Sequence, residues 1–130
     1  MSKYTLANIK EVEDMAPKFG HAPNMEVRFA RKALEMDGFG MTYQKLAPNH
    51  RVPFNHKHKE QEEVFLVLSG SARAKLDDEV IELKQWDALR VSPATVRGLE
   101  AGSNGAELLV IGNRAGMGDT VMADKDFWDK

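Results

Sequence analysis

The stretch that decides the fold reads His56-Lys57-His58-Lys59-Glu60-Gln61-Glu62-Glu63-Val64-Phe65-Leu66-Val67-Leu68-Ser69-Gly70. In an extended strand, side chains two residues apart lie on the same face. His56 and His58 can therefore direct both imidazole rings into one interior. Beyond the intervening turn, Glu63 shares a face with Phe65 and Val67. Because this apolar pair marks the inward face, we expect Glu63 to be a carboxylate in the core beside two histidines.

Short strand-like segments surround this stretch and are separated by turn residues. They cover residues 39–46, 63–68, 71–76, 79–83, 88–91, 97–101 and 107–111, with turns expected at Ser69-Gly70, Asp77-Asp78 and Gly102-Ser103-Asn104-Gly105. This spacing is typical of an all-β sandwich or barrel and leaves no room for helical crossovers. We predict one domain over residues 1–130, with a barrel core at about 26–112, a short N-terminal arm at 1–25 and a C-terminal tail at 113–130. Helix should be confined to short pieces near the N-terminus.

Composition excludes several classes of protein. The 130 residues include no cysteine, which rules out disulfides, thiolate metal sites and cysteine nucleophiles. Lysine and arginine number 18 against 20 acidic residues, so the chain offers no basic face for nucleic acid. No apolar segment approaches the ~20 residues of a membrane helix, and the first residues do not resemble a signal peptide. We therefore expect a cytoplasmic protein that binds neither nucleic acid nor membranes.

Two imidazoles and one carboxylate form a donor set that suits a divalent first-row metal, namely Fe, Mn, Ni, Cu or Zn. The candidate ligands are His56, His58 and Glu63. The alternative is that the histidines belong to a charged loop at the rim, because Lys57 and Lys59 flank them. The inward carboxylate favours the metal site, and the identity of the metal stays open.

The spacing His56-x-His58-x4-Glu63-x6-Gly70 resembles the first sequence motif of the cupins. The resemblance covers roughly residues 39–111, more than half of the chain. It implies a double-stranded β-helix, or jelly-roll, barrel. The interior of such barrels often holds a metal on two histidines, a glutamate and a later histidine. On this resemblance, His56, His58 and Glu63 are the expected metal ligands.

The chain departs from the cupin pattern at three positions. His50 stands where the first motif opens with glycine. The second motif resembles the segment 86–98, in which Ala94 replaces a turn glycine and Arg97 takes the place of the later histidine. Arginine is a permanent cation without a lone pair to donate, so it cannot be a fourth metal ligand.

Three arrangements of Arg97 follow. The guanidinium reaches past a metal and binds an anionic ligand, or it replaces the metal and pairs with Glu63, or it points to solvent. Arg97 shares strand parity with the apolar Leu99 and Ala101, so we expect it to enter the pocket. An unpaired charge there would cost several kcal/mol. Arg97 is accordingly a candidate ligand-binding residue, together with Tyr43 and His50.

Three functions remain open at this point. The first is a barrel that binds or acts on a small anionic organic molecule, with a divalent metal. The second is a non-catalytic, metal-free binding or sensor domain with an Arg97–Glu63 or Arg97–anion pair, and the third is a structural domain. Fold resemblance cannot choose among them, because this architecture hosts many chemistries. We also expect a homodimer, with the N-terminal arm or Phe127-Trp128 at the interface, because these segments carry apolar side chains outside the barrel pattern.

Overall fold

A computed structural model describes residues 3–114 and 118–130, and its regular secondary structure is almost entirely β. The strands are β1 (Met25–Phe29), β2 (Phe39–Leu46), β3 (His56–His58), β4 (Glu63–Leu76), β5 (Glu79–Lys84), β6 (Ala88–Val91), β7 (Arg97–Asn113) and β8 (Thr120–Met122). Two short 3-10 helices complete the described elements, η1 (Ile9–Glu11) and η2 (Phe127–Asp129). The predicted all-β class is confirmed. The expectation that helix lies near the N-terminus alone is wrong, because η2 forms a single turn at the other end.

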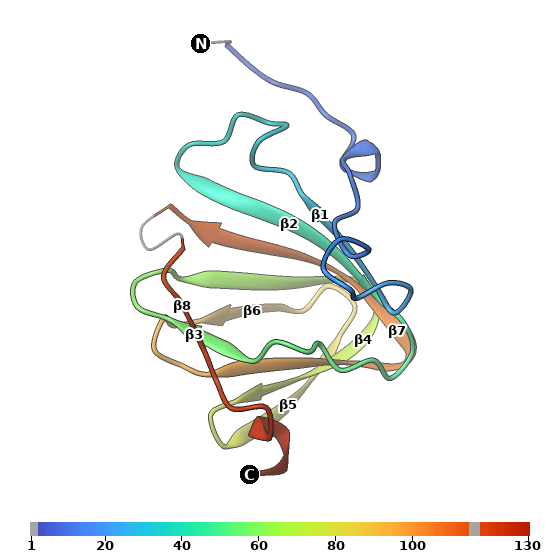
Figure 1. Ribbon diagram of the computed structural model, residues 1–130, viewed down its shortest axis with the longest axis vertical. Coiled ribbons are helices and arrows are strands. Elements are labelled where there is room, and N and C mark those ends of the chain that lie inside the picture. The colour runs from blue at the N-terminus through green and yellow to red at the C-terminus, as the bar shows by residue number, and fades with distance from the viewer. Residues whose placement is uncertain (1–2, 115–117) are drawn as a thin grey trace.

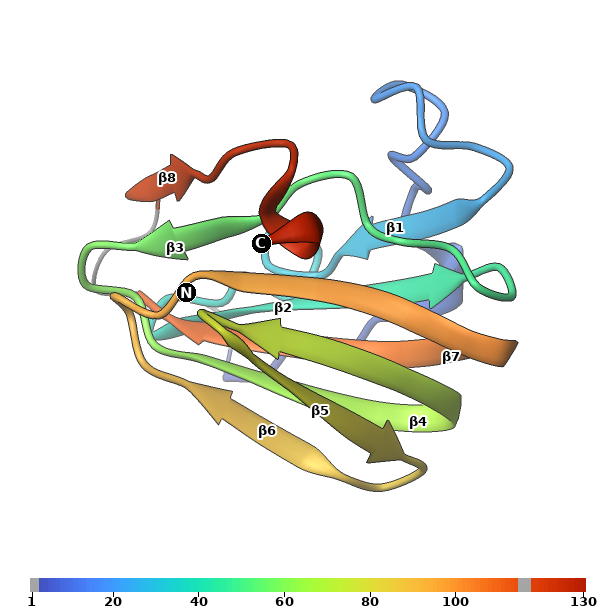
Figure 2. The same cartoon turned by 90° about the horizontal axis from the view of Figure 1, so that it is seen from below.

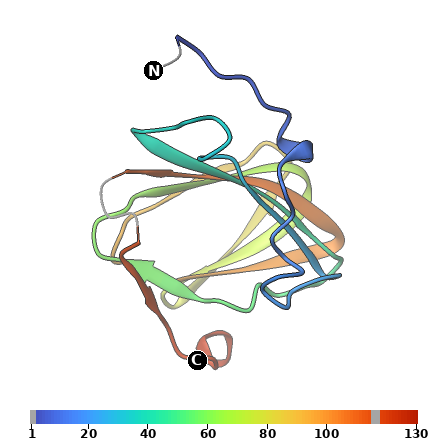
Figure 3. The same ribbon diagram turned by 45° about the horizontal axis from the view of Figure 1, so that its top comes forward.

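Two long strands, β4 and β7, hold the barrel together because each takes part in both layers. The first half of β4 pairs with β6 and with the second half of β7, which continues to β2 and then β1. The second half of β4 pairs with β5 and with the first half of β7, beside which lie β3 and then β8. The strands curl around a common interior (Figures 1 and 3), as the predicted jelly-roll requires.

The expected turns at Ser69-Gly70 and at 102–105 are wrong, because β4 and β7 run through them without a break. Gly70 and Gly105 have φ angles of 73° and 78°, in the left-handed region that favours glycine. A Cβ atom on Gly70 would lie 2.0 Å from the carbonyl oxygen of Gly105. The pairing register also shifts between Val67 and Ser69, and again between Gly70 and Ala72. Such bulges bend a strand from one layer into the other.

Substitution of Gly70 by alanine tests this bend. We expect the free energy of unfolding to fall by roughly 2–3 kcal/mol, from the left-handed backbone and from crowding of Gly105. Urea unfolding measures the loss. Gly20→Ala is the matched control, because Gly20 has a φ of 78° but nothing within 4 Å of an added Cβ. Equal losses in the two variants would contradict a role for the close approach.

The C-terminal segment packs on the barrel and is not a detached tail. Strand β8 pairs with β3 along residues 120–122 (Figure 2). Phe127 is buried, and the buried Lys75 ammonium donates to the carbonyl oxygens of Phe127 and Lys130, at 2.5 and 2.8 Å. The segment 113–130, predicted to lie outside the barrel, therefore adds a strand to it. Among the residues that the structure describes, no helix is long and apolar enough to cross a membrane.

Candidate metal centre

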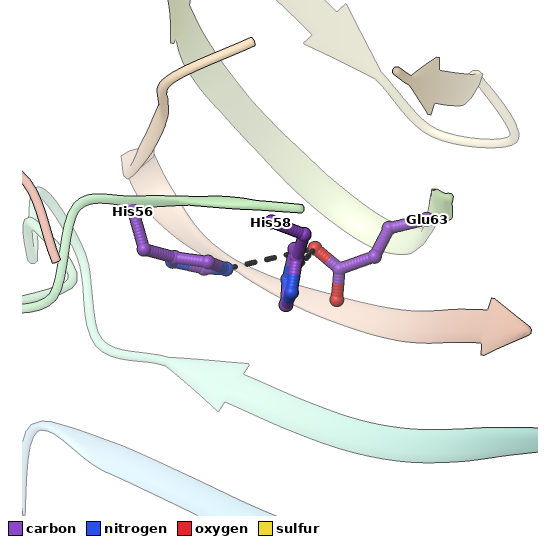
Figure 4. Close-up of side chains that lie close together, drawn as sticks. All are labelled: His56, His58 and Glu63. Carbon is purple, nitrogen blue, oxygen red and sulfur yellow. Dashed lines mark ion pairs between the residues drawn. The ribbon is translucent and has the colours of Figure 1, made fainter. Parts of the chain in front are cut away.

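Three side chains predicted to converge do meet inside the barrel. His56 and His58 leave β3 on the same side, and Glu63 opens β4 opposite them (Figure 4). Oε1 of Glu63 lies 3.6 Å from Nε2 of His56 and 3.3 Å from Nε2 of His58. One donor atom from each residue lies within 4.8 Å of the other two. Donors at about 2.1 Å from a tetrahedrally bound ion stand about 3.4 Å apart, so this spacing fits a first-row metal.

Asp119 holds the ring of His58 in place, and the sequence patterns do not point to it. Oδ1 of Asp119 lies 2.8 Å from Nδ1 of His58, while its Oδ2 accepts from the backbone N–H groups of Glu60 and Gln61. Burial would raise the pKa of Asp119, but these hydrogen bonds lower it to about 2. An ionised carboxylate only accepts hydrogen bonds, so Nδ1 of His58 must be the donor.

Nε2 of His58 is consequently the ring atom left to face the centre of the site. It is buried and has no hydrogen-bond partner among the described residues. In a neutral His58 ring, the lone pair of Nε2 points toward Oε1 of Glu63. Both atoms are hydrogen-bond acceptors, so this contact is unfavourable. A cation between the two atoms would resolve this conflict, and a proton on Nε2 is the alternative. The donor set therefore fits a divalent metal.

Arg97 enters the interior and pairs with Glu63. Its side chain is 3% exposed, and Nη1 donates to Oε1 of Glu63 at 2.7 Å. Nη2 donates to the carbonyl oxygens of Ser92 and Thr95, each at 2.9 Å, and to that of Pro93 at 3.1 Å. The solvent-facing arrangement is therefore wrong, and the structure has the guanidinium paired with Glu63.

The carboxyl group of Glu63 is held ionised by these neighbours. Its burial alone would raise its pKa, but its contacts with the ring of His56 and with the guanidinium of Arg97 outweigh that effect. The pKa of Glu63 consequently lies below its ordinary value. An ionised carboxylate is the form that ligates a metal.

The triad opens into a cavity of about 570 Å³. Most of its wall is aliphatic or aromatic, with contributions from Val52, Phe54, Phe65, Leu89, Val91, Leu99 and Val110. Uncharged polar side chains on the wall include Thr42, Gln44 and Gln61. A mostly apolar wall with a few convergent polar groups is the usual form of a small-molecule site.

Two residues predicted to bind a ligand, Tyr43 and His50, are not among the residues that line this cavity. On β2 the side chains of Thr42 and Gln44 face inward, so Tyr43 lies on the opposite face. There its hydroxyl donates to Glu107. Burial and this carboxylate raise the pKa of Tyr43. Burial lowers the pKa of His50, whose Nε2 is enclosed away from the cavity.

Comparison with known proteins agrees with this architecture. A family described as "Cupin domain" matches residues 42–112. No curated protein sequence gives a significant match. A cupin protein from Bacteroides fragilis superposes with a TM-score of 0.72 at 27% identity, over 89% of this chain and 88% of that one.

Two enzymes of known structure share the fold at lower identity. The polyketide cyclase RemF from Streptomyces resistomycificus superposes with a TM-score of 0.70 at 23% identity, over 87% of this chain and 80% of that one. A variant of Bacillus subtilis oxalate decarboxylase gives 0.71 at 17% identity, over 92% of this chain and 33% of that one. The family match spans more than half of the sequence and contains the triad, and the superpositions agree on the barrel, so this chain belongs to the cupin family.

Proposed function

We propose that this protein binds one divalent transition metal through His56, His58 and Glu63, and uses it to bind or transform a small organic molecule. The observation that carries the proposal is the buried Nε2 of His58, which faces Glu63 without a hydrogen-bond donor. Two histidines and one carboxylate leave coordination positions open, as in metal sites that bind a substrate directly. The family membership supports the proposal, because enzymes share this fold.

The residues of the chain have distinct roles in this proposal. When bound, a metal would polarise an oxygen of the ligand as a Lewis acid. Arg97 offsets the charge of Glu63 and fixes its orientation, and Asp119 fixes the orientation of the His58 ring. The apolar wall limits the water that reaches the site. A small anionic head on the ligand would bind at the metal, since Arg97 already has its partners.

The second candidate function is a metal-free binding or sensor domain. The Arg97–Glu63 ion pair favours it, because this cation occupies the carboxylate oxygen nearest the histidines. In that case His58 would be an imidazolium between two carboxylates, with Nδ1–H donated to Asp119 and Nε2–H donated to Glu63. The two functions differ in whether the purified protein retains a metal.

Metal titration of chelator-treated protein separates them. We expect Mn, Fe, Ni, Cu or Zn to bind at one ion per chain, measured by calorimetry and elemental analysis. Glu63→Gln should weaken that binding because an amide is a poorer ligand than a carboxylate. Glu62→Gln is the matched control, since Glu62 is exposed and pairs with Arg90. Stoichiometric binding that is equal in both variants, or no binding by the wild type, would contradict the proposal.

We also propose that the chain forms a homodimer through its N-terminal arm. Tyr4 and Leu6 are 81% and 91% exposed, and apolar side chains presented in this way favour association. Phe127 no longer supports an interface, because it is buried against its own barrel. Light scattering should give twice the chain mass, and a Tyr4→Ser, Leu6→Ser variant should give the single mass. A monomeric wild type at working concentration would contradict the dimer.

A further inference from the structure

We propose that the ligand carries an apolar, ring-sized body that lies against the cavity wall while its oxygen-bearing head binds at the triad. The inference rests on the proposed function and names the class of ligand. It is an organic acid with a substantial apolar part, in contrast to a two-carbon or three-carbon acid or a sugar.

The cavity is large and its wall is mostly apolar. Its volume of about 570 Å³ falls within the range of sites for drug-sized molecules. An apolar cavity of about 150 Å³ already accommodates a benzene ring. A lactate-sized acid bound at the triad would therefore leave most of the apolar wall facing water, whereas a ring beside the head would cover it.

The cavity wall has few charged side chains. Of the charged residues that line it, Glu63 and Arg97 neutralise each other at 2.7 Å, and the exposed Arg31 is the one other lysine, arginine or acidic side chain among the described lining residues. Gln61 is also engaged, because its amide nitrogen donates to the carbonyl oxygen of Asn113. The polar side chains that remain on the wall, apart from the triad, are outnumbered by the apolar ones: His21, Arg31, Thr42, Gln44 and Thr120. A sugar, with hydroxyls on every side, would therefore lose hydrogen bonds with water on entry.

Two half-exposed aromatic rings also line the cavity. Phe19 in the N-terminal arm and Phe29 at the end of β1 both line the cavity, although they are 52% and 45% exposed. Their rings pack edge to face with centroids 6.3 Å apart. They stand where the cavity meets solvent, and an aromatic edge there offers a surface for an apolar group.

Affinities of two acids with the same head test this assignment. Lactate and 3-phenyllactate are titrated calorimetrically into metal-loaded protein and into chelator-treated protein. We expect 3-phenyllactate to bind at least about tenfold more tightly than lactate in both forms, because burial of the ring adds apolar contact. Phe29→Ala should reduce that ratio by roughly threefold. Phe39→Ala is the control, since Phe39 is 47% exposed but does not line the cavity.

The outcomes separate this proposal from the proposed function. Equal affinities for the two acids in both forms, or equal effects of Phe29→Ala and Phe39→Ala, would overturn the apolar body. A preference for 3-phenyllactate that is the same with and without metal supports the apolar body. If, in addition, the metal does not increase the affinity for either acid, the apolar body of the ligand is supported and the metal-dependent function is contradicted.

Discussion

Replacement of Arg97 by alanine is expected to lower the free energy of unfolding at neutral pH by about 3–5 kcal/mol, because it leaves an ionised carboxylate buried without its partner. Glu63 keeps 12% of its side chain exposed, and the guanidinium that neutralises it is 3% exposed. The substitution also breaks the hydrogen bonds that Arg97 donates to the 92–95 segment. Chemical unfolding of chelator-treated protein measures the loss without any contribution from a metal.

The loss should depend on pH in a defined direction. The pKa of Glu63 is lowered in the folded protein, partly through Arg97. A lowered carboxyl pKa adds stability above the unfolded pKa and loses it as the pH falls through the folded pKa. The difference between wild type and Arg97→Ala should therefore be full at pH 7 and shrink below the ordinary pKa of glutamate, near 4.3.

Arg90 supplies the matched control for this prediction. Arg90 pairs with Glu62 at 2.8 Å, nearly the distance of the Arg97–Glu63 pair. In contrast to that pair, the side chains of both Arg90 and Glu62 are at least half exposed. Exposed ion pairs contribute about 0–1 kcal/mol, so Arg90→Ala should change stability little at any pH. If Arg97→Ala behaved like Arg90→Ala, the ion pair would not be a buried structural element and the assignment of Arg97 to the interior would be wrong.

Strand alternation explains why much of the site could be predicted from the sequence. The side-chain direction of a strand repeats every two residues, so Phe65 and Val67 reveal where Glu63 points, and Leu99 and Ala101 reveal the same for Arg97. Both inferences use near neighbours in the chain. They place the side chains in the interior without any knowledge of which strands pair.

Glycines and covered faces explain where the sequence was misleading. Gly70 and Gly105 need positive φ angles, which a turn and a bulged strand both provide, so local sequence cannot distinguish the two. On β2, the arm covers the outer face, where Lys10 lies over the ring of Tyr43. Polar Thr42 faces the cavity instead. When both faces of a strand are covered, an apolar residue no longer marks the interior.

Asp119 could not be predicted because its role depends on pairing between distant segments. It is 61 residues from His58 in the chain, and the two meet because β8 pairs with β3. Its neighbourhood in the sequence contains several other acidic residues and offers no local signal to choose this one. Only the topology of the barrel distinguishes Asp119 from the exposed Asp124 and Asp126.

Asp119→Asn is expected to weaken metal binding by about 10–100-fold, the usual effect of removing a carboxylate that supports a ligating histidine. The carboxylate accepts at both ends, from Nδ1 of His58 and from the N–H groups of Glu60 and Gln61. An asparagine amide has one acceptor oxygen, so one end must present N–H to another donor. Either the ring of His58 then loses its fixed orientation, or residue 119 loses its hydrogen bonds from the backbone of Glu60 and Gln61.

Metal affinity measured by competition with a chromogenic chelator checks this, with circular dichroism to confirm that the barrel is folded. Asp124→Asn is the control from the same segment, because Asp124 is exposed and pairs with Lys130 at 2.7 Å, away from the triad. The two variants remove the same charge, so a general electrostatic effect would weaken both alike. A loss confined to Asp119→Asn assigns the effect to the contact with His58. Unchanged affinity in Asp119→Asn would show that metal binding does not depend on the orientation that Asp119 imposes.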